Sequence, residues 1–152
     1  MTDSAKTDPL GRASRLRLKQ AREAAGKHPS ELAKYADNSP SSYYDLENCD
    51  GEIFMNIDLR NLDGLCAALG MRPKNLFILQ PPEHAIRPEE LCREINAYLK
   101  RANIALNDFE EKVNYTIAPA FEDASQVLTW NIDCLRNVCS EIGVNWIEAL
   151  PT

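Results

Sequence analysis

Apolar residues recur every three or four positions along most of the chain, which is the spacing of amphipathic helices. In the first half the pattern runs through residues 16–25, 29–36, 40–48 and 59–69, and a last short turn follows Pro73. Gly26 and Gly70 directly follow two of these segments, where glycine commonly terminates a helix. Ser39 and Pro40 begin another, because serine caps a helix and proline fits its first turn. The pattern predicts five short helices and no strand of consequence.

The second half carries helix signals of its own, from about residue 87 to residue 150. Pro88 is predicted to start a helix that Asn103 ends, and Asn107 with Glu110 has the spacing of a capping box at the start of the next. The stretch Gln80-Pro81-Pro82 separates the halves and predicts a rigid linker, since consecutive prolines cannot continue a helix. We therefore expect two domains, residues 1–80 with a polar N-terminal tail and residues 83–152.

The two halves share a pattern beyond their common periodicity. Three pairs stand 73 positions apart, namely Leu62 with Leu135, Cys66 with Cys139, and Gly70 with Gly143. Further upstream the offset grows to 75 and then 77, as if the second half had lost loop residues. Any two helical bundles can share leucine and glycine spacings by chance, but a matched cysteine favours a diverged tandem duplication.

Three segments of the first half resemble a known domain. They read LKQAREAAGKHPSELAKYA, NSPSSYYDLEN and LDGLCAALGMRPKNLF, and they cover most of residues 14–78. Together they resemble the helix-turn-helix domain of the Cro and lambda-repressor class, also labelled XRE. The resemblance implies an all-α, five-helix, repressor-like bundle for the first half. With the matched spacings, we expect two such bundles in tandem, the second one degenerate. The resemblance also implies that the helix over residues 40–48 is the one that enters the DNA major groove.

Composition limits the function classes. The 152 residues are 44% hydrophobic and 26% charged, which is typical of a globular protein, and the net charge of −6 works against nonspecific binding to phosphate. The N-terminal residues lack a signal-peptide pattern, and no apolar run reaches the length of a membrane span, so we expect a cytoplasmic protein without membrane contact.

No catalytic, cofactor or metal pattern is present in the sequence. The five cysteines form no C-x-x-C pair, and the two histidines stand far apart beside prolines, so a zinc site has little support. We expect reduced, structural thiols, with Cys66 and Cys139 on buried helix faces, and core positions for Trp130 and Trp146. The sequence predicts a non-enzymatic protein with no cofactor.

Acidic residues are concentrated where the resembled family reads DNA. Tyr44 and Asp45 should point outward from the predicted third helix, and carboxylates continue past it. The predicted protein-binding face consists of Tyr44, Asp45, Glu47, Asp50, Glu52 and Asp58. A plain solvated face is the other interpretation of the same run.

The first helix is basic, which keeps a DNA-binding alternative open. Six basic residues stand between Arg12 and Lys27 against one acidic residue, and they could hold a phosphate backbone or form an ordinary solvated face. Under this alternative the DNA-binding residues are Arg15, Arg17, Lys19, Ser41, Ser42 and Tyr44.

Two functions are therefore expected. The first is an acidic protein-binding module, such as an immunity protein, antitoxin or antiactivator, that neutralises a basic partner, for example a nucleic-acid-directed toxin or regulator. The alternative is a sequence-specific DNA-binding transcriptional regulator, as the family resemblance implies. The charge of the face made by the second and third helices should discriminate between them. The sequence does not define the oligomeric state.

Overall fold

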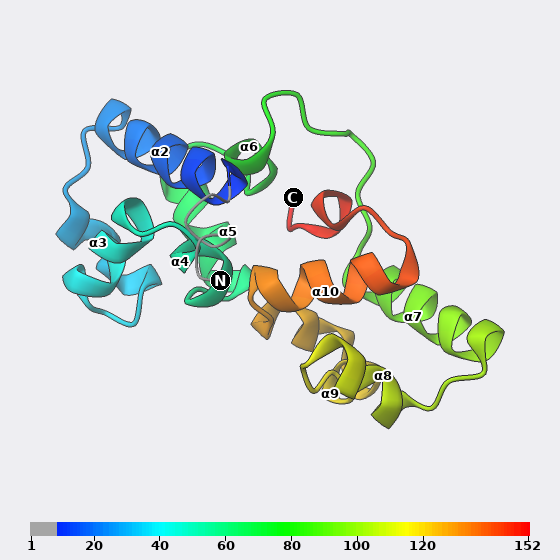
Figure 1. The fold of residues 1–152 in the computed structure, drawn as a ribbon. Coiled ribbons are helices and arrows are strands. Elements are labelled where there is room, and N and C mark those ends of the chain that lie inside the picture. Colours follow the sequence, from blue (N-terminus) through cyan, green and yellow to red (C-terminus); the bar gives the residue numbers. More distant parts are fainter. Residues whose placement is uncertain (1–8) are drawn as a thin grey trace.

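The computed structural model describes residues 9–152, which form short helices in two groups (Figure 1). The first group contains α2 (Pro9–Ala24), η1 (Pro29–Tyr35), α3 (Pro40–Asn48), α4 (Glu52–Met55), α5 (Leu59–Ala68) and α6 (Lys74–Phe77). The second contains α7 (Pro88–Ala102), α8 (Leu106–Val113), α9 (Pro119–Glu122), η2 (Ala124–Thr129), α10 (Ile132–Ile142) and η3 (Trp146–Ala149). Within residues 9–152 the only β pairing is one isolated bridge between Asp58 and Asn131. The predicted all-α fold class is confirmed.

Helix α3 has the bounds that its sequence predicts. The Ser39 side chain accepts a hydrogen bond from the Ser42 backbone N–H at 3.2 Å, and Pro40 is the first helical residue. Gly70 ends the α5 region in the left-handed conformation, with φ of +71°. A residue with a Cβ is strained there, so glycine defines this end of the helix.

Three local features differ from the prediction. Residues 29–35 form a 3₁₀ helix rather than an α-helix. The one-turn helix α4 follows Gly51, in a stretch where the pattern predicts no helix, and it buries Ile53 and Phe54. The predicted capping box of Asn107 and Glu110 is wrong, because α8 starts at Leu106 without a side-chain cap. The Glu110 carboxylate instead accepts hydrogen bonds from the backbone of the turn before α9.

A single apolar core extends through both groups of helices. Cys66 and Cys139 lie fully buried in it, as predicted, and none of the five cysteines is in a disulfide. Trp130 is buried, and Trp146 packs edge-on against Phe77 with ring centroids 5.2 Å apart. The core is therefore shared between the two halves rather than divided by the linker.

Direct hydrogen bonds to backbone carbonyls join the halves beside the isolated bridge. The Leu59 N–H donates to the Trp130 carbonyl at 2.8 Å, and the Asn131 side-chain amide donates to the Met55 carbonyl at 3.1 Å. Asp58 and Asn131 are also the N-caps of α5 and α10, so the bridge links the starts of these two helices.

Several hydrogen bonds of the first half recur 73 positions later. Asp58 accepts from the Asn61 N–H at 2.7 Å, and Asn131 accepts from the Cys134 N–H at 2.8 Å. At the other ends of the same helices, the Met71 N–H donates to the Cys66 carbonyl at 3.0 Å and the Val144 N–H donates to the Cys139 carbonyl at 2.9 Å. The helices α5 and α10 are thus capped alike at both ends.

The linker between α6 and α7 is anchored by a buried lysine. Lys74 is only 2% exposed, and its ammonium group donates to the carbonyls of Pro82 at 3.4 Å and His84 at 3.1 Å. Burial lowers the pKa of Lys74, with Arg72 adding to the effect and Glu148 opposing it. The linker therefore follows a defined path over α6.

None of the helices within residues 9–152 is both long and apolar enough to cross a membrane.

Candidate interaction face on helix α3

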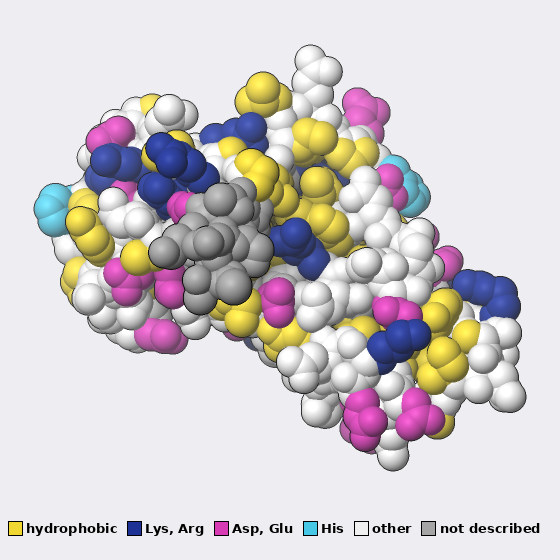
Figure 2. Space-filling view, viewed as in Figure 1, with side chains coloured by type: hydrophobic (Ala, Val, Ile, Leu, Met, Phe, Trp, Pro, Cys, Tyr) yellow, Lys and Arg dark blue, Asp and Glu magenta, His cyan; other side chains and the backbone are white. Residues whose placement is uncertain are grey.

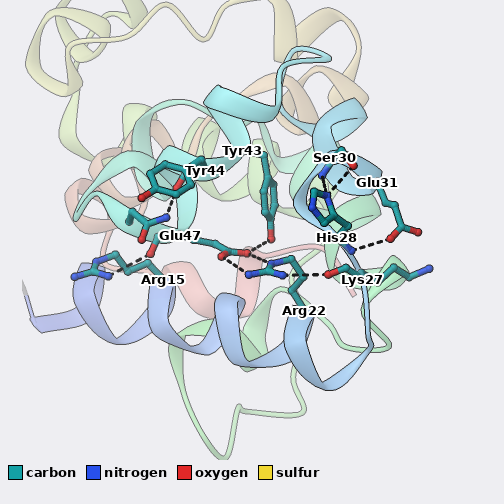
Figure 3. Close-up of polar contacts among 10 residues, drawn as sticks. Arg15, Arg22, Lys27, His28, Ser30, Glu31, Tyr43, Tyr44 and Glu47 are labelled. Atoms are coloured by element: carbon teal, nitrogen blue, oxygen red, sulfur yellow. Dashed lines mark hydrogen bonds and ion pairs between the residues drawn. The ribbon is translucent and has the colours of Figure 1, made fainter.

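A buried polar network fixes α3 against α2 (Figure 3). The carboxylate of Glu47 accepts from Arg22 Nε at 2.6 Å and from Arg22 Nη2 at 3.0 Å, and the Tyr43 hydroxyl donates to it at 2.6 Å. Arg22 Nη1 also donates to the Lys27 carbonyl at 3.1 Å, which ties in the end of α2. These contacts define the orientation of α3 and hence which side chains it exposes.

The network perturbs the protonation of its members. The pKa of Arg22 is raised, chiefly by its hydrogen bonds to Glu47. Burial, followed by the hydrogen bond to Glu47, raises the pKa of Tyr43 far above its ordinary value. The guanidinium and the phenol therefore stay protonated at neutral pH, and the charge of Glu47 is satisfied inside the protein.

Glu47 is consequently not part of an exposed face. It is 3% exposed and lies on the same side of α3 as Tyr43 and Leu46, which face the core. The expectation that Glu47 contributes to a protein-binding surface is wrong, because its helical phase points it at Arg22.

Asp50 and Asp58 also have partners within the chain. Asp50 forms an ion pair with Arg15 Nε, and Arg15 Nη1 donates to the Glu47 carbonyl at 3.2 Å. Asp58 caps α5 at the junction of the two halves. The predicted run of carboxylates therefore does not form one continuous acidic face.

The outward side of α3 retains a smaller set of the predicted residues. Tyr44 is 60% exposed, and Ser41 is exposed beside it at the start of the helix. Asp45 and Glu52 are half-buried, and Glu52 accepts from the Asn56 side chain at 2.7 Å. Ser42, a predicted DNA contact, is half-buried in the first turn. We call Ser41, Tyr44, Asp45 and the exposed Asn48 the α3 face.

Two of the three predicted phosphate-binding residues on α2 have contacts inside the chain. Arg15 pairs with Asp50, as described, and Arg17 Nη1 donates to the Leu76 carbonyl at 2.8 Å. Lys19 is exposed, as is Arg12. Figure 2 shows basic side chains gathered over α2, and acidic ones on the α3 side and at the α8–α9 end. The basic surface is therefore smaller than the residue count of α2 suggests.

The exposed charges of η1, α3 and the turn between them are mainly negative. Glu31 and Asp37 are exposed, and Asp45 is half-buried, whereas Lys34 is the basic residue of these elements. The Lys34 ammonium lies over the Tyr35 ring, 5.3 Å from its centroid. This is the face whose charge distinguishes the two functions considered for the sequence.

Sequence reasoning did not identify the Arg22–Glu47 pair. One local signal was available, because Tyr43 and Glu47 are four positions apart and lie on one side of a helix. The arginine comes from a different helix, 25 positions away, and no sequence rule selects it from the basic residues of α2.

The fold and the position of α3 are consistent with the comparison to known families. Residues 17–82 match the family model described as the Cro/C1-type HTH DNA-binding domain. The match runs from α2 through α6 to the start of the linker, and it agrees with the resemblance inferred from the sequence. No curated protein and no solved structure shows significant similarity to the chain.

Proposed function

We propose that the chain is a non-enzymatic binding module on a helix-turn-helix scaffold, and that its α3 face binds a protein. The observation that carries the proposal is the absence of basic groups among Ser41, Tyr44, Asp45 and Asn48 on the outward side of α3. A carboxylate at a phosphate-facing position forfeits counterion release and adds repulsion, which opposes DNA binding. An exposed tyrosine beside a carboxylate is a common anchor in protein interfaces.

A basic protein is the complement that this face fits. Charge complementarity mainly accelerates association and selects the partner. The proposed partner is a nucleic-acid-directed toxin or regulator with a basic cleft, which makes the chain an immunity protein, antitoxin or antiactivator. A cytoplasmic location belongs to this proposal.

The test compares two charge reversals of equal size. Asp45→Lys changes the α3 face, whereas Glu94→Lys changes an exposed residue of α7 by the same net charge. After nuclease treatment of a host lysate, the wild-type chain and Glu94→Lys should retain the same basic protein, and Asp45→Lys and Tyr44→Ala should lose it. Equal retention by all four proteins contradicts the proposal.

The second candidate function is a sequence-specific DNA-binding transcriptional regulator, which the family match over residues 17–82 favours. Asp45→Lys then has the opposite effect, because it adds a phosphate contact and strengthens DNA binding. Fluorescence anisotropy with random duplex DNA measures the affinity of the wild-type protein and of Asp45→Lys for DNA. Nanomolar binding of wild-type protein to a specific duplex at physiological salt, weakened by Ser41→Ala and Tyr44→Ala, supports the regulator.

We further propose that the second half is a diverged copy of the first. The equal capping of α5 and α10 at an offset of 73 supports this, as does the left-handed glycine at Gly70 and Gly143. The helix-starting prolines Pro9 and Pro88 are 79 positions apart, so the offset shrinks along the chain, as loop deletions would cause. A solved structure whose α7–α10 region does not superpose on α2–α5 rules out a duplicated unit.

A further inference from the structure

The contact between the halves is made by equivalent elements on both sides. Helix α5 packs against η2, and α10 packs against α4. Moving α4 by the offset of 73 places it on residues 125–128, which lie inside η2, and the same shift places α5 on α10. Each half therefore presents the same pair of elements to the other. A contact that is reciprocal in this way is isologous, the type that a two-fold axis generates.

The centre of the contact lies where such an axis would pass. The isolated bridge is antiparallel and pairs Asp58 with Asn131. Asn131 is the residue that corresponds to Asp58 at the offset of 73. A residue can face its own equivalent only on or beside a two-fold axis. Farther out, α6 packs against η3, and these two elements also correspond to each other, with Phe77 against Trp146.

We propose that the chain is a dimer folded within one polypeptide. The first half carries a docking surface formed by α4, residues 56–58 and α5, and this surface fits a unit of its own kind. The second half occupies it, in the place that a second copy of the chain would take. This inference rests on the proposed duplication and is independent of what α3 binds.

One contact makes the pairing specific for unlike halves. The Arg136 guanidinium lies over the Phe54 ring, 4.8 Å from its centroid, and 5.5 Å from the Trp146 ring. At the offset of 73, Asp63 takes the place of Arg136 and Pro73 takes the place of Trp146. Two first halves cannot form this stacking, so the first half of one chain should prefer the second half of another. When the two halves are prevented from pairing within one chain, two copies should therefore pair by exchanging their second halves.

The linker offers a direct test with the full chain. Deleting Gln80–Glu83 shortens the connection between Phe77 and Pro88 from ten residues to six. A shortened hinge loop favours docking of the second half on another copy, as in domain swapping. By light scattering, the wild-type chain should have the mass of one 17.1 kDa chain, and the deletion variant twice that mass.

The matched control replaces the same four residues with a Gly-Ser linker of equal length, and it should remain monomeric. A deletion variant that is helical by circular dichroism and monomeric overturns the proposal. A wild-type chain that dimerises through α5 and α10 also overturns it.

A cross-link decides the question even if the deletion variant does not fold. Residues directly opposite each other in an antiparallel pair have Cβ atoms close enough for a disulfide. In a Cys49→Ser background, Asp58→Cys with Asn131→Cys should form an intrachain disulfide under oxidising conditions. On a denaturing gel this monomer should migrate faster before reduction than after it. The deletion variant with the same pair should give a covalent dimer. Absence of the intrachain disulfide in the full-length protein rejects the paired arrangement, and neither measurement depends on a binding partner or on DNA.

Discussion

Helices α3 and α9, which the proposed duplication places in correspondence, are held by different forces. Helix α3 has nine residues and is tied to α2 through the buried pair of Arg22 and Glu47, whereas α9 has four. Glu122 aligns with Glu47 at an offset of 75, yet it is exposed. The first half therefore uses a buried carboxylate to orient its outward helix. The second half does not do so at Glu122.

The second half holds the start of α9 with backbone caps. The Glu110 carboxylate accepts from the N–H groups of Ile117 at 2.7 Å and Ala118 at 2.9 Å, and the Tyr115 hydroxyl donates to Asp133 at 2.7 Å. Such contacts define a turn but do not orient a long helix. The difference supports α3, and not α9, as the face that binds a partner.

The largest expected effect comes from breaking the buried pair. Glu47→Ala removes the carboxylate that accepts from the largely buried Arg22 guanidinium and the buried Tyr43 hydroxyl, which should lower the free energy of unfolding by about 3 kcal/mol. The equivalent change in the second half, Glu122→Ala, should alter it by less than about 0.5 kcal/mol, because that side chain is exposed. Urea titration followed by circular dichroism measures both.

Equal losses for Glu47→Ala and Glu122→Ala contradict the assigned difference between the halves. A further check is Glu47→Gln, which keeps the shape and the hydrogen-bond acceptor. It should be less destabilising than Glu47→Ala.

An intermediate effect is expected at alkaline pH, where the halves differ in their buried thiols. Burial raises the pKa of Cys66, Cys134 and Cys139 to about 12 from an ordinary value of 9.0. Because the folded state holds these protons more tightly, their stabilising contribution is complete below pH 9 and is lost as the pH rises toward 12. The three thiols together should remove about 4 kcal/mol by about pH 10, at about 1.4 kcal/mol per thiol and pH unit.

Comparing unfolding at about pH 8 and about pH 10 under reducing conditions tests this. Cys134→Ala with Cys139→Ala should remove more of the pH dependence than Cys66→Ala, since two of the three thiols lie in the second half. Lys74 acts in the opposite direction, because its lowered pKa makes the folded state gain stability as the pH rises. A stability that increases between these two pH values contradicts the thiol assignment.

The smallest expected effect is the difference in stability lost when each of the two N-caps at the bridge is replaced. Asp58→Ala and Asn131→Ala each remove one cap, which should reduce stability by about 1 kcal/mol. Asn131 also donates to the Met55 carbonyl, so its replacement should lower stability by a further ~1 kcal/mol. Thermal or urea unfolding of the two variants provides the ranking, and a larger loss for Asp58→Ala reverses it.

Local signals predicted the helices well, and contacts between distant segments were not predictable in the same way. Ser39 and Pro40 lie next to each other and fix the start of α3, and Tyr44 was expected outward and is exposed. The burial of Glu47 and the pairing of Asp50 depend on arginines of α2, which only the folded chain brings near. Helix α4 was missed because four residues are too few to show a period.

The buried ammonium of Lys74 shortens the free part of the linker and so reduces the affinity that the two halves need for each other. Its hydrogen bonds to Pro82 and His84 hold the linker on α6, and the Ile86 N–H holds the next segment to the Glu148 carbonyl at 2.7 Å. Little free tether remains, so the effective concentration of one half at the other is set by a short covalent path and reaches about the millimolar range. Two halves that would scarcely associate as separate molecules can therefore stay together in this chain.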